Sequence, residues 1–161
     1  WALNLWVEQK LQDILSSSLQ DTTIRFAGIR IWEDEAAPSD DICTVHTVLE
    51  GRRPAALLLH ADRAFLVRLA QAIMHQSVLS TRDVEDVATE YFNIVCGRVV
   101  AGLFEADHVS ACFQSPCFKP GRYLPKTDST CRCILNYAGG DHERMQLTYL
   151  GLCANEHGAN A

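Results

Sequence analysis

The stretch from Thr81 to Phe104 limits the possible folds of this chain more than any other segment, because its apolar and polar residues alternate with the period of an α-helix. With Glu90 taken as zero on the helical wheel, four polar or small residues lie within roughly 60° of it: Asp83, Asp86, Asn93 and Gly97. The other side is filled by apolar residues: Val84, Val87, Ala88, Tyr91, Phe92, Ile94, Val95 and Val99. The pattern predicts a long amphipathic helix whose Glu90 and Asn93 face solvent.

Glu90 and Asn93 are three residues apart, so a helix places the carboxylate beside the carboxamide. The spacing alone is weak evidence, since a chain of this composition contains about 0.3 such pairs by chance. An exposed helical Glu usually serves solubility. Asn in the middle of a helix is less favourable by a few tenths of a kcal/mol, because its side chain prefers caps and turns. The position of Asn93 therefore invites a functional explanation.

Composition limits the classes of function open to the chain. Its 161 residues, 48% hydrophobic and 21% charged, suit one soluble globular domain. A net charge of −6 without a Lys/Arg run argues against nucleic-acid binding, which needs a basic footprint. No apolar stretch approaches the roughly 20 residues that span a bilayer, and the start of the chain does not resemble a signal peptide. We therefore expect a cytoplasmic location and no membrane partner.

The seven cysteines are odd in number and irregularly spaced in a chain large enough to fold without disulfides, so we expect reduced thiols. The densest group is Cys112, Cys117, Cys131 and Cys133. These four could be zinc ligands, but they lack the paired C-x-x-C spacing of structural zinc sites. The alternative is that Cys131 and Cys133 share one face of a strand as small apolar residues. We expect no metal on this chain.

Periodicity predicts three helices and six strands. Leu3, Trp6, Val7, Leu11, Ile14, Leu15 and Leu19 predict a helix over residues 2–19. A second helix is capped by Asp62, and Ser80 with Asp83 resembles a capping box for the third. Strands are predicted at residues 24–32, 42–49, 55–59, 109–113, 131–137 and 145–149, with a turn through 50–53 and a Pro/Gly-rich loop at 115–125.

This order predicts an α+β fold in which two α-β-β-β halves, meeting near residue 78, form a pseudo-repeat. Long helices would pack on a mainly antiparallel sheet. No Gly-rich phosphate loop follows any strand, so nucleotide-dependent chemistry is not expected. We expect a single domain over residues 1–152 and a flexible tail over 153–161. The chain begins at Trp1 rather than Met, as a domain cut from a longer protein would.

The segment from Asp83 to Gly97 resembles the signature helix of the CheC/CheX chemotaxis phosphatases, whose pattern runs close to Gly-Glu-Ile-Ala-Asn-Ile-Ile-Ala-Gly. The order of the flanking strands and helices is similar over most of the chain. Glu8-Gln9-Lys10-Leu11 on the first helix lacks the Asn, so the single pair looks more like CheX than CheC. Gly97 matches the family. Thr89 stands where the family usually has Gly, and Phe92 where it has a small residue.

The resemblance implies hydrolysis of the aspartyl phosphate on a CheY-like response-regulator receiver domain. Asn93 would orient the attacking water and Glu90 would contact a receiver lysine. Asp83, Asp86 and Gly97 are candidate partner-binding residues, although the two acids could simply favour the helix N-terminus and Gly97 could serve helix packing. No cofactor is expected on this chain, because the receiver supplies Mg²⁺. The resemblance also implies a homodimer.

Two other interpretations remain open. The chain could be a receiver-binding adaptor or sensory module that keeps the fold without hydrolysis, through the Thr89 and Phe92 substitutions. It could also be a zinc-stabilised structural domain. The first differs from a phosphatase in binding a receiver without turnover, and the second in its metal content.

Overall fold

The computed structural model describes residues 2–153, with side chains from Val7 onward, so the predictions for the Leu3 and Trp6 side chains and for the 154–161 tail lie outside it. The helices are α1 (Ala2–Ala27), α2 (Arg63–Met74) and α3 (Thr81–Asp107). The strands are β1 (Trp32–Glu33), β2 (Ile42–Gly51), β3 (Ala55–Asp62), β4 (Ala111–Phe113), β5 (Cys117–Pro120), β6 (Ser129–Gly140) and β7 (Glu143–Leu152). The fold is α+β, as predicted.

The strands of the described chain form one antiparallel sheet in the order β1-β6-β7-β3-β2-β4, and β5 also pairs with β2. The hairpins β2–β3 and β6–β7 meet where β3 pairs with β7. β1 from the first half joins the hairpin of the second half, while β4 and β5 join the hairpin of the first. This crosswise exchange is the arrangement that two related halves would give.

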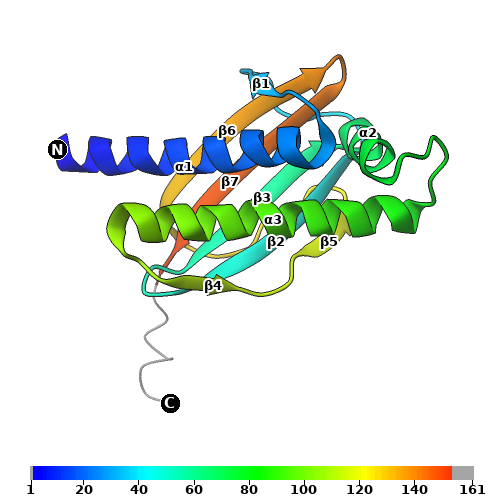
Figure 1. The fold of residues 1–161 in the computed structure, drawn as a ribbon. Coiled ribbons are helices and arrows are strands. Elements are labelled where there is room, and N and C mark those ends of the chain that lie inside the picture. The colour runs from blue at the N-terminus through cyan, green and yellow to red at the C-terminus, as the bar shows by residue number, and fades with distance from the viewer. Residues whose placement is uncertain (1, 154–161) are drawn as a thin grey trace.

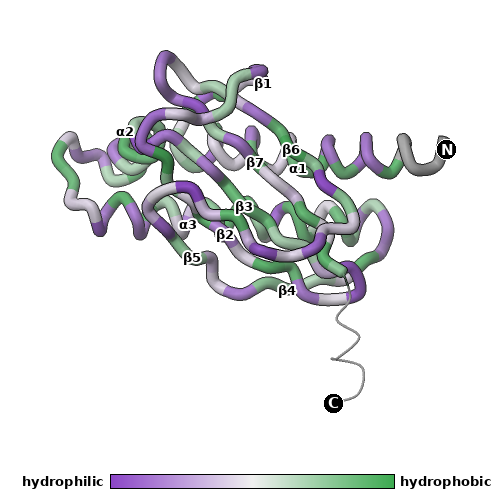
Figure 2. Tube along the Cα trace, turned by 180° about the vertical axis from the view of Figure 1, so that it is seen from behind, coloured by the Kyte–Doolittle hydropathy of each residue, from purple (hydrophilic) through white to green (hydrophobic). Residues whose placement is uncertain are grey.

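The helices cover one face of the sheet, where α1 and α3 lie side by side and run in opposite directions (Figure 1). Most of the largest fully buried side chains lie between the helices and the sheet, and include Tyr91, Tyr137, Phe65, Phe92, Leu15 and Leu19. No helix of the described chain covers the opposite, outer face of the sheet (Figure 2). The chain therefore has two layers, and the side of α3 that points away from the sheet is exposed to solvent.

The prediction of a strand at residues 24–32 was wrong, because α1 continues to Ala27. Thr22 and Thr23, just before the predicted strand, are buried on the face that α1 turns to the core. The helix ends at Gly28, which has a φ of 67° and whose N–H donates to Ile24 O at 2.8 Å. Only the short edge strand β1 remains of the predicted strand.

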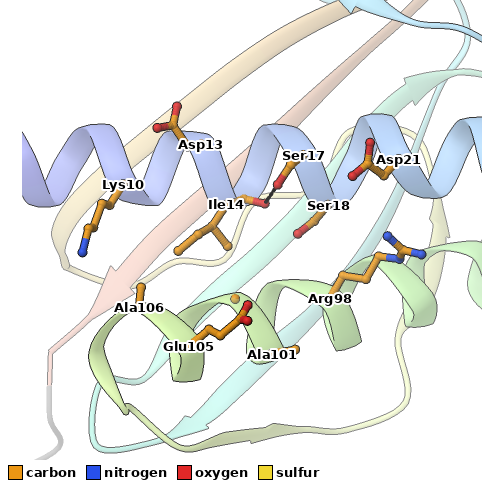
Figure 3. A pocket seen from close by; sticks show the side chains of 11 residues that line it. Lys10, Asp13, Ile14, Ser17, Ser18, Asp21, Arg98, Ala101, Glu105 and Ala106 are labelled. Atoms are coloured by element: carbon orange, nitrogen blue, oxygen red, sulfur yellow. Dashed lines mark hydrogen bonds between the residues drawn. The ribbon is translucent and has the colours of Figure 1, made fainter.

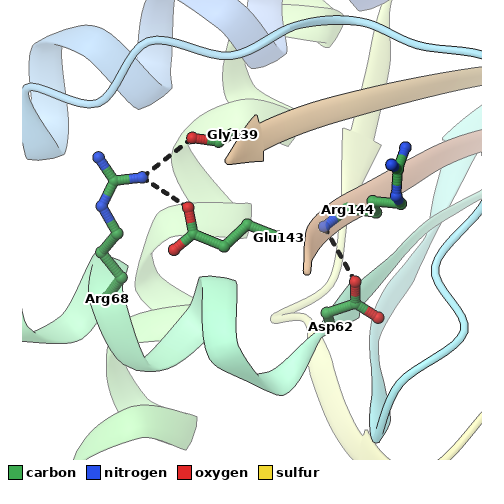
Figure 4. Close-up of polar contacts among 5 residues, drawn as sticks. All are labelled: Asp62, Arg68, Gly139, Glu143 and Arg144. Carbon is green, nitrogen blue, oxygen red and sulfur yellow. Dashed lines mark hydrogen bonds and ion pairs between the residues drawn. The ribbon is translucent and has the colours of Figure 1, made fainter. Parts of the chain in front are cut away.

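The prediction that Asp62 caps α2 is half right. Asp62 is the N-cap residue, but its carboxylate makes no capping hydrogen bond. Instead Oδ1 accepts the backbone N–H of Ser39 and Asp40 at 3.2 and 3.1 Å, and Oδ2 accepts that of Arg144 at 3.0 Å (Figure 4). Nearby, Arg68 of α2 donates to the Glu143 carboxylate at 2.6 Å. Asp62 therefore fixes the loop before β2 and the start of β7 rather than a helix end.

Two further predictions need correction. The loop predicted at residues 115–125 contains β5, whose short length and Pro120 hid it from the alternation rule. The expectation that no segment reaches membrane-spanning length also fails, since α3 is long and apolar enough by length and composition alone. Its apolar side packs in the core, as the helix of a two-layer domain does.

One buried hydrogen bond joins α1 to α3. Thr23 Oγ1 donates to Leu19 O at 2.6 Å, so its contact with Tyr91 Oη at 2.5 Å has Tyr91 as the donor. Both side chains have zero exposure. Tyr91 therefore fixes the distance and the rotation between the two helices.

The two partners of this bond differ in how much stability their removal should cost. Tyr91→Phe leaves Thr23 bonded to Leu19 O, so we expect the free energy of unfolding to fall by about 1 kcal/mol. Thr23→Val leaves the Tyr91 hydroxyl buried without an acceptor, and we expect a larger loss of about 1–3 kcal/mol. Urea denaturation of both variants measures the difference. A larger loss for Tyr91→Phe would contradict the donor assignment.

Candidate functional site

The predicted site residues lie along one exposed stripe of α3. Glu90, Asn93, Gly97 and Asp86 are exposed, and Asp83 is half-buried. Neither Glu90 nor Asn93 makes a side-chain hydrogen bond or ion pair with any residue of the described chain. A polar pair held on a helix without partners of its own is free to bind groups on another molecule.

The packing of α3 sets the direction of this pair. Tyr91, Phe92 and Val95, which alternate with the site residues along the chain, have zero exposure and belong to the main core. The Tyr91 hydroxyl is bonded to α1, and burial raises its pKa well above the usual range, so it remains a neutral donor. Rotation of α3 would expose these rings, so Glu90 and Asn93 are held outward.

Asp83 already has a structural partner. Its carboxylate accepts the Ser80 N–H at 3.1 Å, while Ser80 Oγ accepts the Asp83 N–H at 3.1 Å. This reciprocal pair is the predicted capping box. Asp83 thus stabilises the start of α3 whatever else it does, and its role in partner binding stays a prediction.

Asp86 and Gly97 are less committed to the fold. Asp86 lies 4.0 Å from Arg82 in a largely exposed pair, a geometry that contributes little to stability. A Cβ built on Gly97 would meet no atom within 4 Å. Helix packing therefore does not require glycine at 97, in contrast to Gly102, where a Cβ would come within 2.8 Å of Ile14 Cγ2. The open surface over Gly97 remains available to a partner.

The two departures from the family pattern lie in different environments. Phe92 is fully buried in the core, so its size is accommodated away from the exposed stripe. Thr89 is half-buried one turn before Asn93, and its Oγ1 donates to Glu85 O at 2.8 Å. Thr89 is therefore the departure that a partner approaching Asn93 would meet.

Two residues of α3 are less buried than the sequence pattern predicted. Val87 and Ile94, assigned to the buried side, are half-buried at its border, because each lies only about 60° or less from Glu90 on the wheel. They give the exposed stripe an apolar margin. The helical wheel itself contains this information, and a finer division into buried, border and exposed positions would have found it.

A groove of about 680 Å³ between α1 and α3 was also missed (Figure 3). Its lining includes Asp13, Ile14, Ser17 and Asp21 from α1 and Arg98, Ala101 and Glu105 from α3. Arg98 is half-buried and forms no ion pair with the described residues. The sequence contains no signal for this groove, since it exists only because two helices far apart in the chain lie side by side.

The cysteines do not form one site. Cys112 and Cys117 lie on β4 and β5 at one edge of the sheet, whereas Cys131 and Cys133 lie on β6, beyond β2, β3 and β7. Four strand spacings of about 4.8 Å separate β4 from β6. Among the described residues, no three His, Cys, Asp or Glu side chains are grouped to hold a metal ion. The zinc interpretation is therefore wrong for these four thiols.

No protein-family model and no curated protein matches this sequence. Solved structures do resemble it. Chemotaxis protein CheX from Vibrio vulnificus has a TM-score of 0.77 at 12% identity, over 88% of this chain and 95% of that chain. A CheC-like superfamily protein from Shewanella sp. PV-4 has a TM-score of 0.73 at 12% identity, over 89% and 98%.

A third resemblance is to the CheX–CheY–BeF3–Mg²⁺ complex from Borrelia burgdorferi, with a TM-score of 0.70 at 17% identity, over 90% of this chain and 97% of that chain. At such identities the likeness concerns the fold. The chain is CheX-like in fold, which confirms the resemblance stated from the sequence at that level.

Substitutions of Ser80 and Asp86 test which polar residues near the start of α3 stabilise the fold. Ser80→Ala removes one bond of the capping box, and we expect the free energy of unfolding to fall by about 1 kcal/mol. Asp86→Asn, the matched control on the same stripe, should remain within about 0.5 kcal/mol of the parent protein. Thermal and urea denaturation measure both. Equal stability of Ser80→Ala and the parent would mean that the capping box does not form in solution.

Proposed function

We propose that this CheX-like chain is a phosphatase that removes the aspartyl phosphate from a CheY-like receiver domain. Asn93 positions the attacking water, and Glu90 contacts a receiver lysine. The observation that carries the proposal is the exposed, unpartnered Glu90–Asn93 pair on a helix whose rotation is fixed by buried aromatic rings. The CheX-like fold supports it, because a CheX of this fold occurs in a complex with CheY.

The chemistry requires little from this chain. An acyl phosphate is already reactive and the receiver supplies Mg²⁺, so an auxiliary protein needs to place water in line with the phosphorus–oxygen bond that breaks. The Asn93 amide can accept a hydrogen bond from water and donate one to a phosphoryl oxygen. A carboxylate at this position would repel the phosphoryl oxygens. No metal ligand set on this chain is part of the proposal.

Glu90 lies one turn before Asn93 and carries a charge that Asn93 lacks. A lysine of the receiver would pair with it and bring Asn93 into register with the phosphoryl group. Asp86 and Asp83 extend the acidic stripe toward the start of α3. Gly97, on the other side of Asn93, has no side chain, so a partner can approach the helix backbone closely there. The stripe as a whole suits a partner with basic groups around its active site.

The proposal extends to location and assembly. A chemotaxis receiver is cytoplasmic, and we propose the same compartment for this chain. We also propose a homodimer. Within the described chain, residues 129–135 of β6 have no strand paired on their outer side, because β1 covers only Tyr137 and Ala138. An open sheet edge of this length can pair with a second copy.

The main alternative is a receiver-binding adaptor without hydrolysis. Thr89 favours it, since a branched side chain stands beside Asn93 where the family has glycine. Thr89→Gly separates the two functions. If Thr89 blocks hydrolysis, this variant gains phosphatase activity, whereas an active parent protein is changed little in rate and loses only a few tenths of a kcal/mol in stability.

Asn93 should determine the rate of phosphate loss. We expect the parent chain to accelerate loss of radiolabelled phosphate from its receiver, and Asn93→Ala to reduce that acceleration by on the order of 10²-fold. Gln76→Ala, an exposed substitution in the loop before α3, is the control and should keep full activity. The measurement uses receivers from the same genome.

Glu90 should act mainly through binding. Glu90→Gln keeps the shape of the side chain and removes the charge, so we expect weaker receiver affinity and a weaker dependence of affinity on salt. Calorimetry at two salt concentrations measures both quantities. If the parent chain binds a receiver and leaves phosphate decay unchanged, the phosphatase proposal fails for that receiver and the adaptor function replaces it.

A further inference from the structure

We call residues 117–123 the strap: β5 pairs with β2 at the edge of the sheet, and the three residues after it contact Thr44 and His60 on the outer face. The Gly121 N–H donates to Ile42 O at 2.8 Å. Thr44 Oγ1 donates to Gly121 O at 2.8 Å and accepts the Tyr123 N–H at 3.0 Å. The strap is thus tied to β2 by backbone hydrogen bonds, and its residue Phe118 also packs against the main core.

Two histidines on the outer face of the sheet contact Tyr123 of the strap. His60 of β3 pairs with Thr44, which is two residues from His46 on β2. His60 has zero exposure, and its Nε2 lies 2.7 Å from Tyr123 O. Because a carbonyl oxygen only accepts, Nε2 carries the proton. The ring of His46 lies 4.4 Å from that of Tyr123.

Each ring also has a nitrogen that is buried without a partner: His60 Nδ1 and His46 Nε2. An unprotonated ring nitrogen can remain buried without a partner, because only a hydrogen-bond acceptor is then left unused. A proton added to His60 Nδ1 would create a donor without an acceptor and a charge without a counter-ion. The arrangement therefore accommodates the neutral form of this ring.

The charges around the rings oppose protonation as well. The strap contributes Lys119, whose Nζ lies 4.2 Å above the Tyr123 ring, and Arg122. The residues paired with the histidines on other strands are uncharged: Cys117 of β5 opposite His46, and Thr44 of β2 and Gln146 of β7 opposite His60. Among the described groups, those acting on the two rings include no carboxylate.

These surroundings lower both pKa values. Burial lowers the pKa of His46, with Lys119 and His60 adding to the effect. Burial also lowers the pKa of His60 and Arg122 adds to it, while the hydrogen bond to Tyr123 O acts in the opposite direction. Lifting the strap would remove both cations and admit water, so the rings of an open form would titrate closer to the ordinary value of about 6.5.

We propose that residues 121–123 of the strap are an acid-released cover: neutral His46 and His60 hold them on the outer face of the sheet, and protonation of these rings lifts them. Opening uncovers the apolar patch Ala56, Leu58 and Leu150, against which Tyr123 packs. Closure is favoured above about pH 6.5 and weakens as the pH falls below it, by up to tenfold for each unit by which closing lowers a histidine pKa. This proposal does not depend on the phosphatase function.

Amide hydrogen exchange measured by NMR at pH 7.5 and 5.5, corrected for intrinsic exchange rates, tests the cover directly. We expect the protection of the Gly121 and Tyr123 amides to fall about tenfold or more at pH 5.5. The amide of Val95 in α3 should keep its protection, which distinguishes release of the strap from unfolding. Unchanged protection at Gly121 and Tyr123 would overturn the proposal.

Variants identify the groups responsible. In the double variant His46→Gln/His60→Gln, the new amide at position 60 can still donate to Tyr123 O but cannot titrate, so protection of the strap should become independent of pH. Arg122→Gln removes a cation that lowers the His60 pKa in the closed form, so protection of the strap should fall less at pH 5.5 than in the parent chain. His108→Asn, which changes an exposed histidine at the end of α3, is the control and should behave as the parent chain. A double variant that keeps the parent's pH dependence would overturn the assignment.

NMR titration of the parent chain's imidazole signals provides an independent measurement. We expect His46 and His60 to titrate below about 6.5, together with the loss of strap protection. Titration of both rings while the strap remains protected would also overturn the proposal.

Discussion

Burial of one side of α3 is the constraint on which the rest of the structure depends. Tyr91, Phe92 and Val95 have no exposed surface, and burying a side chain of this size stabilises a fold by roughly 1.5–3 kcal/mol. The hydroxyl of Tyr91 adds a directional bond to α1. Together these contacts fix the rotation of the helix. The polar pair is placed by residues that take no part in its chemistry, which is how a rigid element holds a site that is otherwise unsupported.

The two faces of the sheet are built on different principles. On the helix side, apolar packing leaves only a few buried polar groups; Thr23 and Ser16 have hydrogen-bond partners, whereas Thr22 Oγ1 has none among the described residues. On the outer side, backbone hydrogen bonds and two neutral histidines hold the strap over a small apolar patch. Apolar packing does not depend on pH near neutrality, whereas contacts made through imidazole do. The outer face is therefore the part of this domain that can respond to acid while the helix layer stays intact.

The sequence predicts what depends on local periodicity and misses what depends on contacts between distant segments. α3, its capping box and the two long hairpins follow from apolar spacing and from Ser80 with Asp83. The continuation of α1 to Ala27 does not, because the burial of Thr22 and Thr23 depends on the packing of α1 in the folded domain. The exposure of Glu90 and Asn93 follows from the helical wheel alone. The groove between α1 and α3 and the bonds from Asp62 to a loop and to β7 require the tertiary structure.

The crosswise exchange of strands has a consequence for how such a chain can change over generations. The half that contributes α1 has no acid–amide pair of its own, since Glu8 is followed by Leu11 at the position of the Asn. Its hairpin nevertheless supplies the strand to which β4 and β5 of the other half are bonded. Neither half closes its sheet alone, so the half without the pair cannot be discarded by truncation. The half without the pair is needed for the fold, so its solvent-exposed residues can vary while its buried residues must be kept.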